Sequence, residues 1–272
     1  MAPSRPAQNP MEGTPQHILD LLDRLHAESL AQEHAMDRSV FAGAATDEDK
    51  KTAVRDKFIA LDQDKSQYVY ALCRATDART IVEAGTSFGV STIYLALAAS
   101  ANAAAAGGRG KTPRVVATEY EPTKAARARE HWAQCGDVVT SAIQLREGDL
   151  RETLKEDLED VDLLLLDSKM SLPISVKPIS SRNKDKRRRV VISCPSLLTL
   201  PAILVWTEMA LPTLKIVQRK MRRGAIVIAD NTTVSEGYDE MLTYMRNPDS
   251  GFITMTLPFS QGLEFCVYLP KN

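Results

Sequence analysis

An acidic residue, two glycines and several hydroxyl side chains follow one another in the segment IVEAGTSFGVST, residues 81–92. The segment begins in an apolar run and ends in a predicted helix, which is the setting of a nucleotide-binding loop. Glycine adopts positive φ at low cost, and the first N–H groups of a helix are free to donate hydrogen bonds. We therefore predict a ligand-binding loop formed by Glu83, Gly85, Thr86, Ser87 and Ser91.

The charge and spacing of this loop indicate which ligand it binds. Its glycines are spaced Gly-x-x-x-Gly, whereas dinucleotide enzymes use Gly-x-Gly-x-x-Gly to seat a pyrophosphate at the helix N-terminus. Glu83 would repel a pyrophosphate, but it suits the ammonium of a methionine moiety near a sulfonium. Glu119, at the end of the next predicted strand, can accept the hydroxyls of a ribose. We expect S-adenosyl-L-methionine here; a glycine turn that only joins strand to helix is the alternative.

A second group of oxygen-bearing side chains follows two later apolar runs. Asp167 ends the run VDLLLLD, and Asp230 and Asn231 come directly after AIVIA. If the two strands are neighbours, these three side chains meet at one edge of the sheet. Hard oxygen ligands suit Mg²⁺, Mn²⁺ or Ca²⁺. The pattern predicts a divalent metal site, and the alternative is that Asp230 and Asn231 only cap a helix or form an Asx turn.

The elements that must position these residues alternate along the chain. Apolar runs predict strands at 80–84, 114–119, 142–146, 161–167 and 225–229, and helical patterns fall at 91–103, 122–135, 208–221 and 235–246. This alternation is typical of an α/β fold with a Rossmann-like, doubly wound, mostly parallel sheet. Residues 251–257 and 262–269 are expected to form a C-terminal antiparallel hairpin. Before the first strand, an N-terminal helical extension is predicted at 15–36 and 47–75.

Four motifs in a fixed order carry a family resemblance: E-x-G-x-x-x-G-x-S, T-E-Y-E-P, a strand that ends in Asp, and A-D-N after another strand. This order resembles the class I S-adenosylmethionine-dependent O-methyltransferases, nearest to family 3, the catechol and caffeoyl-CoA type. The resemblance spans about residues 47–269. It implies methyl transfer to a hydroxyl of a small molecule, an aromatic with adjacent oxygens. We expect the chain to consist of a disordered tail at 1–14, N-terminal helices at 15–75 and a methyltransferase domain at 76–272.

The resemblance also implies roles for individual residues. Around the methionine part of the cofactor it places Glu83, Gly85, Thr86, Ser87 and Ser91. It assigns the ribose to Glu119 and the adenine to Tyr120, Asp149 and Leu150. Asp167 would lie beside the transferred methyl group as a catalytic residue and would share a Mg²⁺ (or Mn²⁺ or Ca²⁺) with Asp230 and Asn231. The catechol type has a lysine base in D-x-x-K, but Lys169 stands at a different offset, so no base is assigned.

Residues 169–205 do not fit the family pattern. The segment mixes Ser, Pro and basic residues, including KDKRRR, and then turns apolar. Three interpretations are open: a lid inserted over the active site, a basic patch for nuclear import or phosphate binding, or a translated intron. We favour the intron because the composition is foreign to both neighbouring segments. A cofactor-binding but inactive isoform would follow if the segment blocks the site.

Composition and charge restrict the remaining function classes. The net charge of −1 gives no general attraction to nucleic acid or to anionic membranes. The four cysteines form no CxxC pair, which argues against a zinc cluster or a disulfide framework. No secretory signal or membrane span is evident, so we expect a cytoplasmic protein. The resemblance implies a small-molecule acceptor. A homodimer is compatible with the resemblance, and a nitrogen acceptor is the nearest rival to a hydroxyl.

Overall fold

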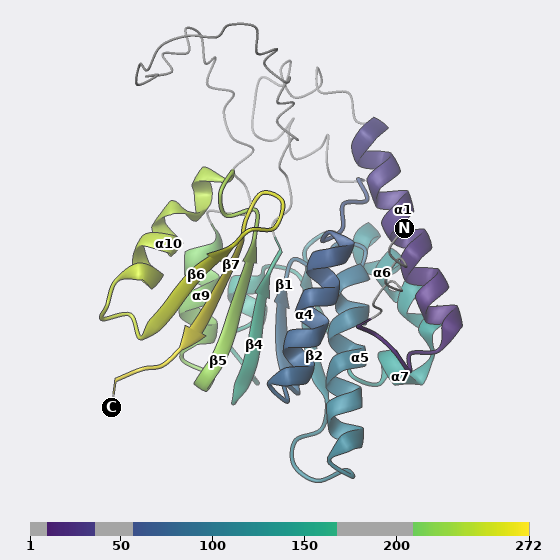
Figure 1. Ribbon diagram of the computed structural model, residues 1–272, viewed down its shortest axis with the longest axis horizontal. Coiled ribbons are helices and arrows are strands. Elements are labelled where there is room, and N and C mark those ends of the chain that lie inside the picture. The colour runs from purple at the N-terminus through teal and green to yellow at the C-terminus, as the bar shows by residue number, and fades with distance from the viewer. Residues whose placement is uncertain (1–9, 36–56, 168–208, 272) are drawn as a thin grey trace, which may run out of the picture.

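The computed structural model describes residues 10–35, 57–167 and 209–271 (Figure 1). Seven strands form one sheet in the order β3-β2-β1-β4-β5-β7-β6. The strands are β1 Thr80–Ala84, β2 Arg114–Glu119, β3 Ile143–Glu147, β4 Val161–Leu166, β5 Met221–Asp230, β6 Phe252–Leu257 and β7 Leu263–Tyr268. The first five pair in parallel, and β7 pairs antiparallel with both β5 and β6. The predicted doubly wound sheet with an antiparallel C-terminal hairpin is confirmed.

Helices cover both faces of this sheet. The helices are α1 Gln16–Ala35, α4 Gln63–Ala75, α5 Val90–Ala105, α6 Pro122–Cys135, α7 Asp137–Thr140, α8 Leu150–Thr153, α9 Ala210–Gln218 and α10 Asp239–Arg246, with the 3-10 turn η2 at Glu236–Tyr238. Helices α1, α4, α5 and α6 gather on one side of the molecule, and α9 and α10 lie on the other (Figure 1). Each side has its own apolar core.

Strand β4 contributes side chains to both apolar cores. Its six residues are all buried, and successive side chains of a strand point to opposite faces. Leu163 and Leu165 belong to the core under α4 and α5, while Leu164 and Leu166 belong to the core under α9 and α10. A continuous leucine run is therefore what a central strand covered on both faces requires.

The strand order reverses between β1 and β4. From β1 the chain winds outward through β2 to β3, and from β4 it winds the other way to β5. Ligands of open α/β sheets bind outside the carboxyl ends of the strands at such a reversal. Here the Asp167 amide donates to the Ala84 carbonyl at 3.2 Å, just beyond the two central strands.

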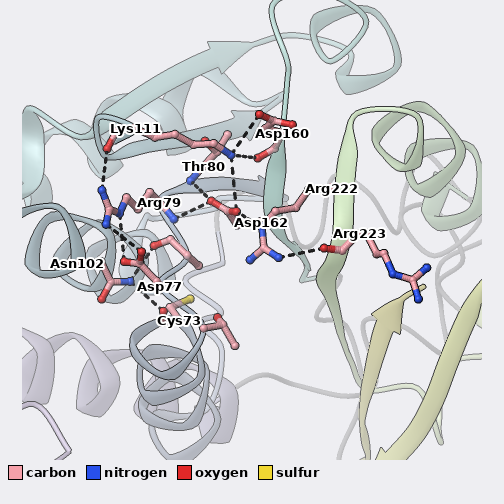
Figure 2. A network of polar contacts seen from close by, with 12 residues as sticks. Cys73, Asp77, Arg79, Thr80, Asn102, Lys111, Asp160, Asp162, Arg222 and Arg223 are labelled. Carbon is pink, nitrogen blue, oxygen red and sulfur yellow. Dashed lines mark hydrogen bonds and ion pairs between the residues drawn. The ribbon is translucent and has the colours of Figure 1, made fainter. Parts of the chain in front are cut away.

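The opposite end of the sheet is held by a polar network centred on Asp162, which is 5% exposed (Figure 2). Its carboxylate accepts the amides of Arg79 at 2.9 Å and Thr80 at 2.8 Å, and it also accepts from the Arg222 guanidinium. These partners stand at the starts of β1 and β5, and Asp162 itself lies near the start of β4. One side chain thus ties the amino ends of three adjacent strands, at the end away from Asp167.

Several predicted boundaries need correction. The helix expected at 47–75 begins only at Gln63 in the described chain; residues 57–62 are irregular, although Phe58 and Leu61 are buried as expected. Met221 lies in β5 rather than in the preceding helix, because it pairs with Val161 and so extends the sheet ladder. The helix expected at 235–246 is divided into η2 and α10. The short helices α7 and α8 were not predicted.

The N-terminal extension is ordered earlier than predicted. Met11, which the sequence places in the tail, is 1% exposed and belongs to the core beside Ile18 and Leu22. Helix α1 then follows the predicted apolar spacing, with Ile18, Leu21, Leu22 and Leu25 buried. A disordered tail remains a prediction for residues 1–9, which lie outside the described residues.

Two further expectations concern other parts of the chain. The segment 169–205, including KDKRRR, lies outside the described residues, so its three interpretations stay open. None of the helices that the structure describes is both long and apolar enough to cross a membrane.

Candidate active site

The loop between β1 and α5 turns by positive backbone angles at three residues: Gly85 (φ 94°), Ser87 (φ 51°) and Gly89 (φ 77°). It is fastened to β2, since the Thr86 amide donates to the Thr118 carbonyl at 2.9 Å. The Gly89 amide closes the turn on the Thr86 carbonyl at 2.9 Å. The predicted strand-loop-helix arrangement is therefore present.

Gly89 is needed for packing against α6. A Cβ at this position would lie 2.5 Å from Trp132 Nε1 and 2.9 Å from Ala128 Cβ. The Trp132 indole also donates to the Gly89 carbonyl at 2.9 Å. The space beside Gly89 that a Cβ would need is therefore occupied by the Trp132 indole.

Glu83 is fully buried and bound by hydroxyl groups of its own loop and helix. Its carboxylate accepts from Ser91 Oγ at 2.6 Å, from Thr86 Oγ1 at 2.8 Å and from Thr92 Oγ1. Burial raises the pKa of Glu83, and the three hydroxyl donors oppose that rise. Sequence reasoning missed Thr92, although its hydroxyl adjoins Ser91 in the printed motif. In this arrangement Glu83 organises the loop; direct contact with a cofactor ammonium stays a prediction.

Glu119 stands at the carboxyl end of β2, facing the same loop. Its carboxylate accepts the Ser87 amide at 2.7 Å, the Glu121 amide at 2.8 Å and the Tyr120 amide at 2.9 Å. Burial raises the pKa of Glu119, while these amides and nearby Lys124 act in the opposite direction. A carboxylate offers about four lone-pair sites, so acceptor capacity remains for a ligand hydroxyl. Tyr120 is 64% exposed beside it and is accessible for stacking.

The oxygen-bearing residues that follow β4 and β5 lie at neighbouring strand ends. The two strands are hydrogen-bonded neighbours, and Leu166 is in register with Ala229. Asp167 and the pair Asp230–Asn231 follow those positions directly, at the carboxyl edge of the sheet. Asp230 and Asn231 are fully buried, so their polar atoms need partners inside the protein or from a ligand.

Lys65, from the first turn of α4, was not foreseen at this site. Its Nζ lies 2.6 Å from Asp230 Oδ1 and 3.1 Å from Asp62 Oδ2, and its side chain is fully buried. The helical pattern of residues 47–75 gave no reason to place a lysine inside. Lys65 and Asp230 are 165 positions apart in the sequence. They come together only because the fold packs α4 against the end of β5.

Beside this ion pair, several buried polar atoms have no hydrogen-bond partner among the described residues. They are Asn231 Oδ1 and Nδ2, Thr232 Oγ1 and, in the β6–β7 turn, Gln261 Oε1. The turn is joined to this strand end, because the Thr233 amide donates to the Gln261 carbonyl at 3.1 Å. Asn231 also has a positive φ of 61°. Buried groups of this kind usually bind a ligand, an ion or water.

Comparison with known proteins shows which family has this arrangement of loop and strands. A family model described as a methyltransferase domain matches residues 82–176, which include the glycine loop, β2 and β4. The chain contains a methyltransferase domain. Its fold is that of the S-adenosylmethionine-dependent O-methyltransferases, as the sequence resemblance implied.

Solved structures similar to this methyltransferase domain share its fold at low sequence identity. Cofactor-bound Rv0187 from MTB is 20% identical, with a TM-score of 0.56, and the match covers 98% of this chain and 100% of that one. The O-methyltransferase from Bacillus cereus in complex with SAH is 15% identical, with a TM-score of 0.52 and coverage of 90% and 99%. SAH-bound PaMTH1 of Podospora anserina is 14% identical, with a TM-score of 0.53 and coverage of 93% and 88%. No curated protein sequence matches the chain.

Two residues expected near the adenine have structural roles in the methyltransferase domain. Asp149 caps α8 by accepting the Arg151 amide at 2.9 Å, and it forms an ion pair with the same arginine. This contact lowers the pKa of Asp149. Leu150 is 4% exposed and packs in the core under α9 and α10. Their contact with adenine stays a prediction.

The metal site also stays a prediction. Among the described residues, no three His, Cys, Asp or Glu side chains are grouped so as to hold a metal ion. The predicted set contains only two carboxylates, Asp167 and Asp230, and one of them is paired with Lys65. The neutral amide of Asn231 completes it.

Proposed function

We propose that this protein binds S-adenosyl-L-methionine and transfers its methyl group to a hydroxyl of a small aromatic molecule with adjacent oxygens. The observation that carries the proposal is the contact between Glu119 and the Ser87 amide at 2.7 Å. This contact holds the Glu119 carboxylate against the glycine loop at the carboxyl ends of β1 and β2, and a carboxylate in that position suits the hydroxyls of a ribose. The bound SAH named for two proteins of similar fold supports the same ligand class.

The charge of the loop favours a sulfonium cofactor over a dinucleotide. Glu83 and Glu119 are close enough that the charge of Glu119 contributes to the raised pKa of Glu83. The loop at residues 83–91 contains no basic side chain, and the acidic groups Glu83 and Glu119 adjoin it. A pyrophosphate would be repelled there, whereas the ammonium and sulfonium of S-adenosylmethionine would be attracted. The exposed ring of Tyr120 supplies an adenine-stacking surface at the same strand end.

A divalent ion is part of the proposal because of Asn231. Its buried amide oxygen is of the ligand type that Mg²⁺ and Ca²⁺ accept, and it has no partner in the described chain. Asp167, Asp230 and Asn231 would hold the ion. It would lower the pKa of the acceptor hydroxyl and orient its oxygen.

The residues of this chain contribute placement and electrostatics. When bound, S-adenosylmethionine supplies the electrophilic methyl group. Glu119 and the loop hold the cofactor at the ends of β1 and β2. Asp230 and Asn231, at the end of β5, hold the ion that orients the acceptor hydroxyl. Asp167 lies between these two groups, next to Ala84. Holding two reactants in line can account for much of the rate gain of such a transfer.

Calorimetric titration with S-adenosylhomocysteine tests the cofactor assignment. We expect saturable binding by the wild type and at least about tenfold weaker binding by Glu119→Ala, which removes a charge-assisted acceptor. Glu147→Ala is the matched control, because Glu147 is in register with Glu119 on β3 but is exposed. Tight binding of NADH without any binding of S-adenosylhomocysteine would refute the proposal.

Metal removal tests the acceptor side. Turnover with radiolabelled cofactor should be lost in EDTA and return with Mg²⁺ or Mn²⁺, and Asp167→Ala and Asp230→Ala should abolish it. Full activity in EDTA would exclude the metal. A panel of hydroxyl and amine acceptors in the same assay separates O- from N-methylation. The cytoplasmic location, the homodimer and the lack of nucleic-acid or membrane partners stay predictions.

A further inference from the structure

We propose that Lys65 is a positioning residue. Its ammonium pairs with Asp230, holds that side chain in place and lowers the affinity of the acceptor site for a divalent ion. The proposal rests on the metal clause of the proposed function. It concerns a lysine from the N-terminal helices, a part of the chain to which sequence analysis gave no chemical role.

Lys65 forms a buried ion pair with Asp230. Its Nζ lies 2.6 Å from Asp230 Oδ1, and both side chains are fully buried. Asp62, one turn earlier and 35% exposed, approaches the same nitrogen at 3.1 Å. A buried ammonium is tolerated only when it is paired in this way. The pair therefore fixes the Asp230 side chain and anchors α4 to the end of β5.

The ammonium also changes what Asp230 can bind. It neutralises one of the two carboxylates that would face a divalent ion, and it places a positive charge within hydrogen-bond distance of a proposed ligand. Charges of the same sign repel strongly in a buried site, where water does not screen them. Asn231, whose amide is not engaged by Lys65, keeps its oxygen available. An ion at this site would therefore bind against the field of Lys65.

Two consequences follow from this arrangement. Without metal, Lys65 keeps buried Asp230 from being an uncompensated charge, so the site is formed before any ligand enters. With metal, the two cations are coupled negatively, and by linkage the loss of one must strengthen the binding of the other. A purely structural ion pair would not produce the second effect.

The test compares Mn²⁺ binding in the wild type, Lys65→Met, Lys65→Gln and Lys65→Arg, using calorimetry and thermal unfolding with and without Mn²⁺. Lys155→Met is the matched control, because that lysine is exposed and lies on the surface beside Glu152. We expect Lys65→Met and Lys65→Gln to bind Mn²⁺ about tenfold more tightly or better, within the usual range of coupling between two sites. Their Tm should be lower without metal and should rise more on adding Mn²⁺ than that of the wild type. Lys65→Arg, which keeps the charge, should bind Mn²⁺ like the wild type.

Unchanged or weaker Mn²⁺ binding in both neutral variants would overturn the proposal, as would the absence of Mn²⁺ binding in every protein. Lys65→Gln keeps a hydrogen-bond donor, so it decides the matter if Lys65→Met does not fold. Titration of the same samples with S-adenosylhomocysteine reports on the proposed function separately, because Lys65 lies at the β5 end and not at the glycine loop.

Discussion

The two halves of the candidate active site treat their buried polar groups differently. At the β1–β2 end, Glu83 has three hydroxyl donors and Glu119 has three amide donors, all from the protein itself. At the β5 end, Asn231, Thr232 and Gln261 have buried polar atoms without partners in the described chain. Within the described residues, the two carboxylates of the first end have protein donors, whereas these atoms of the second end have no protein partner.

This difference indicates how each half recognises what it binds. A loop whose charges are already hydrogen-bonded keeps its shape and can bind one ligand repeatedly with little reorganisation. A site with unpartnered groups gains from any ligand that satisfies them. We therefore expect that removing a carboxylate with several protein donors, such as Glu83, costs stability, whereas removing a side chain without a described partner, such as Asn231, costs function.

The largest expected effect is at Glu83. Glu83→Leu leaves the hydroxyls of Thr86, Ser91 and Thr92 without their acceptor in a buried site. At about 1–3 kcal/mol for each unsatisfied group, the loss in unfolding free energy should be at least about 3 kcal/mol. Urea denaturation measures it, with the exposed Glu147→Leu as control. An unchanged urea midpoint would show that the loop does not depend on this carboxylate.

The next effect tests whether the loop needs α6. Gly89→Ala forces a Cβ against Trp132, 2.5 Å from its Nε1, at a φ of 77°. We expect a loss of about 2–3 kcal/mol in unfolding free energy. Gly107→Ala, with φ 62° and no atom within 4 Å, isolates the backbone cost of about 1 kcal/mol. Equal losses in the two variants would contradict the packing role.

Asn231 should behave in the opposite way. Asn231→Gly removes an amide without a partner in the described chain and relieves a positive φ of 61°, while glycine adds entropy to the unfolded chain. These effects oppose each other, so the free energy of unfolding should change by no more than about 1 kcal/mol. Methyl transfer should nevertheless fall about tenfold or more, because a proposed ligand is lost. Asp160→Gly, at an exposed residue with φ 49°, should keep full activity. A stability loss at Asn231 with unchanged turnover would reverse the comparison.

The smallest effect is a pH dependence. Burial raises the pKa of Glu83 above its ordinary value of 4.5. A carboxyl with a raised native pKa favours the folded state most when it is protonated, and this contribution is lost as the pH rises through the native pKa. The stability of the wild type relative to Glu83→Gln should therefore decrease as pH increases from about 4.5 upward. Paired urea unfolding curves across that range measure the trend, and a flat difference would contradict it.

Much of the fold could be predicted because local patterns determine it. Strands β1 and β2 and helix α6 begin and end where the apolar runs and Pro122 indicated. The glycine loop, the position of Glu119 at the end of β2 and the neighbouring ends of β4 and β5 followed from the expected topology of a doubly wound sheet. These features depend on neighbours in sequence or on the general topology of a doubly wound sheet.

What could not be predicted depends on contacts between distant segments. No periodicity reveals that Lys65 pairs with Asp230, or that an indole from α6 occupies the space beside Gly89. Met221 joined β5 because Val161 pairs with it, against the helical pattern around it. A sequence pattern predicts which face of a helix or strand a side chain lies on. Which residue it contacts there depends on how the elements pack in the folded protein.

The Asp162 network has a consequence for the alignment of the candidate active site. Because one carboxylate joins the beginnings of β1, β4 and β5, the relative register of these strands is set at the end away from the ligand-binding residues. The same strands remain paired up to Ala84, Leu166 and Ala229, so a shift at Asp162 would displace the glycine loop, Asp167 and Asp230 relative to one another.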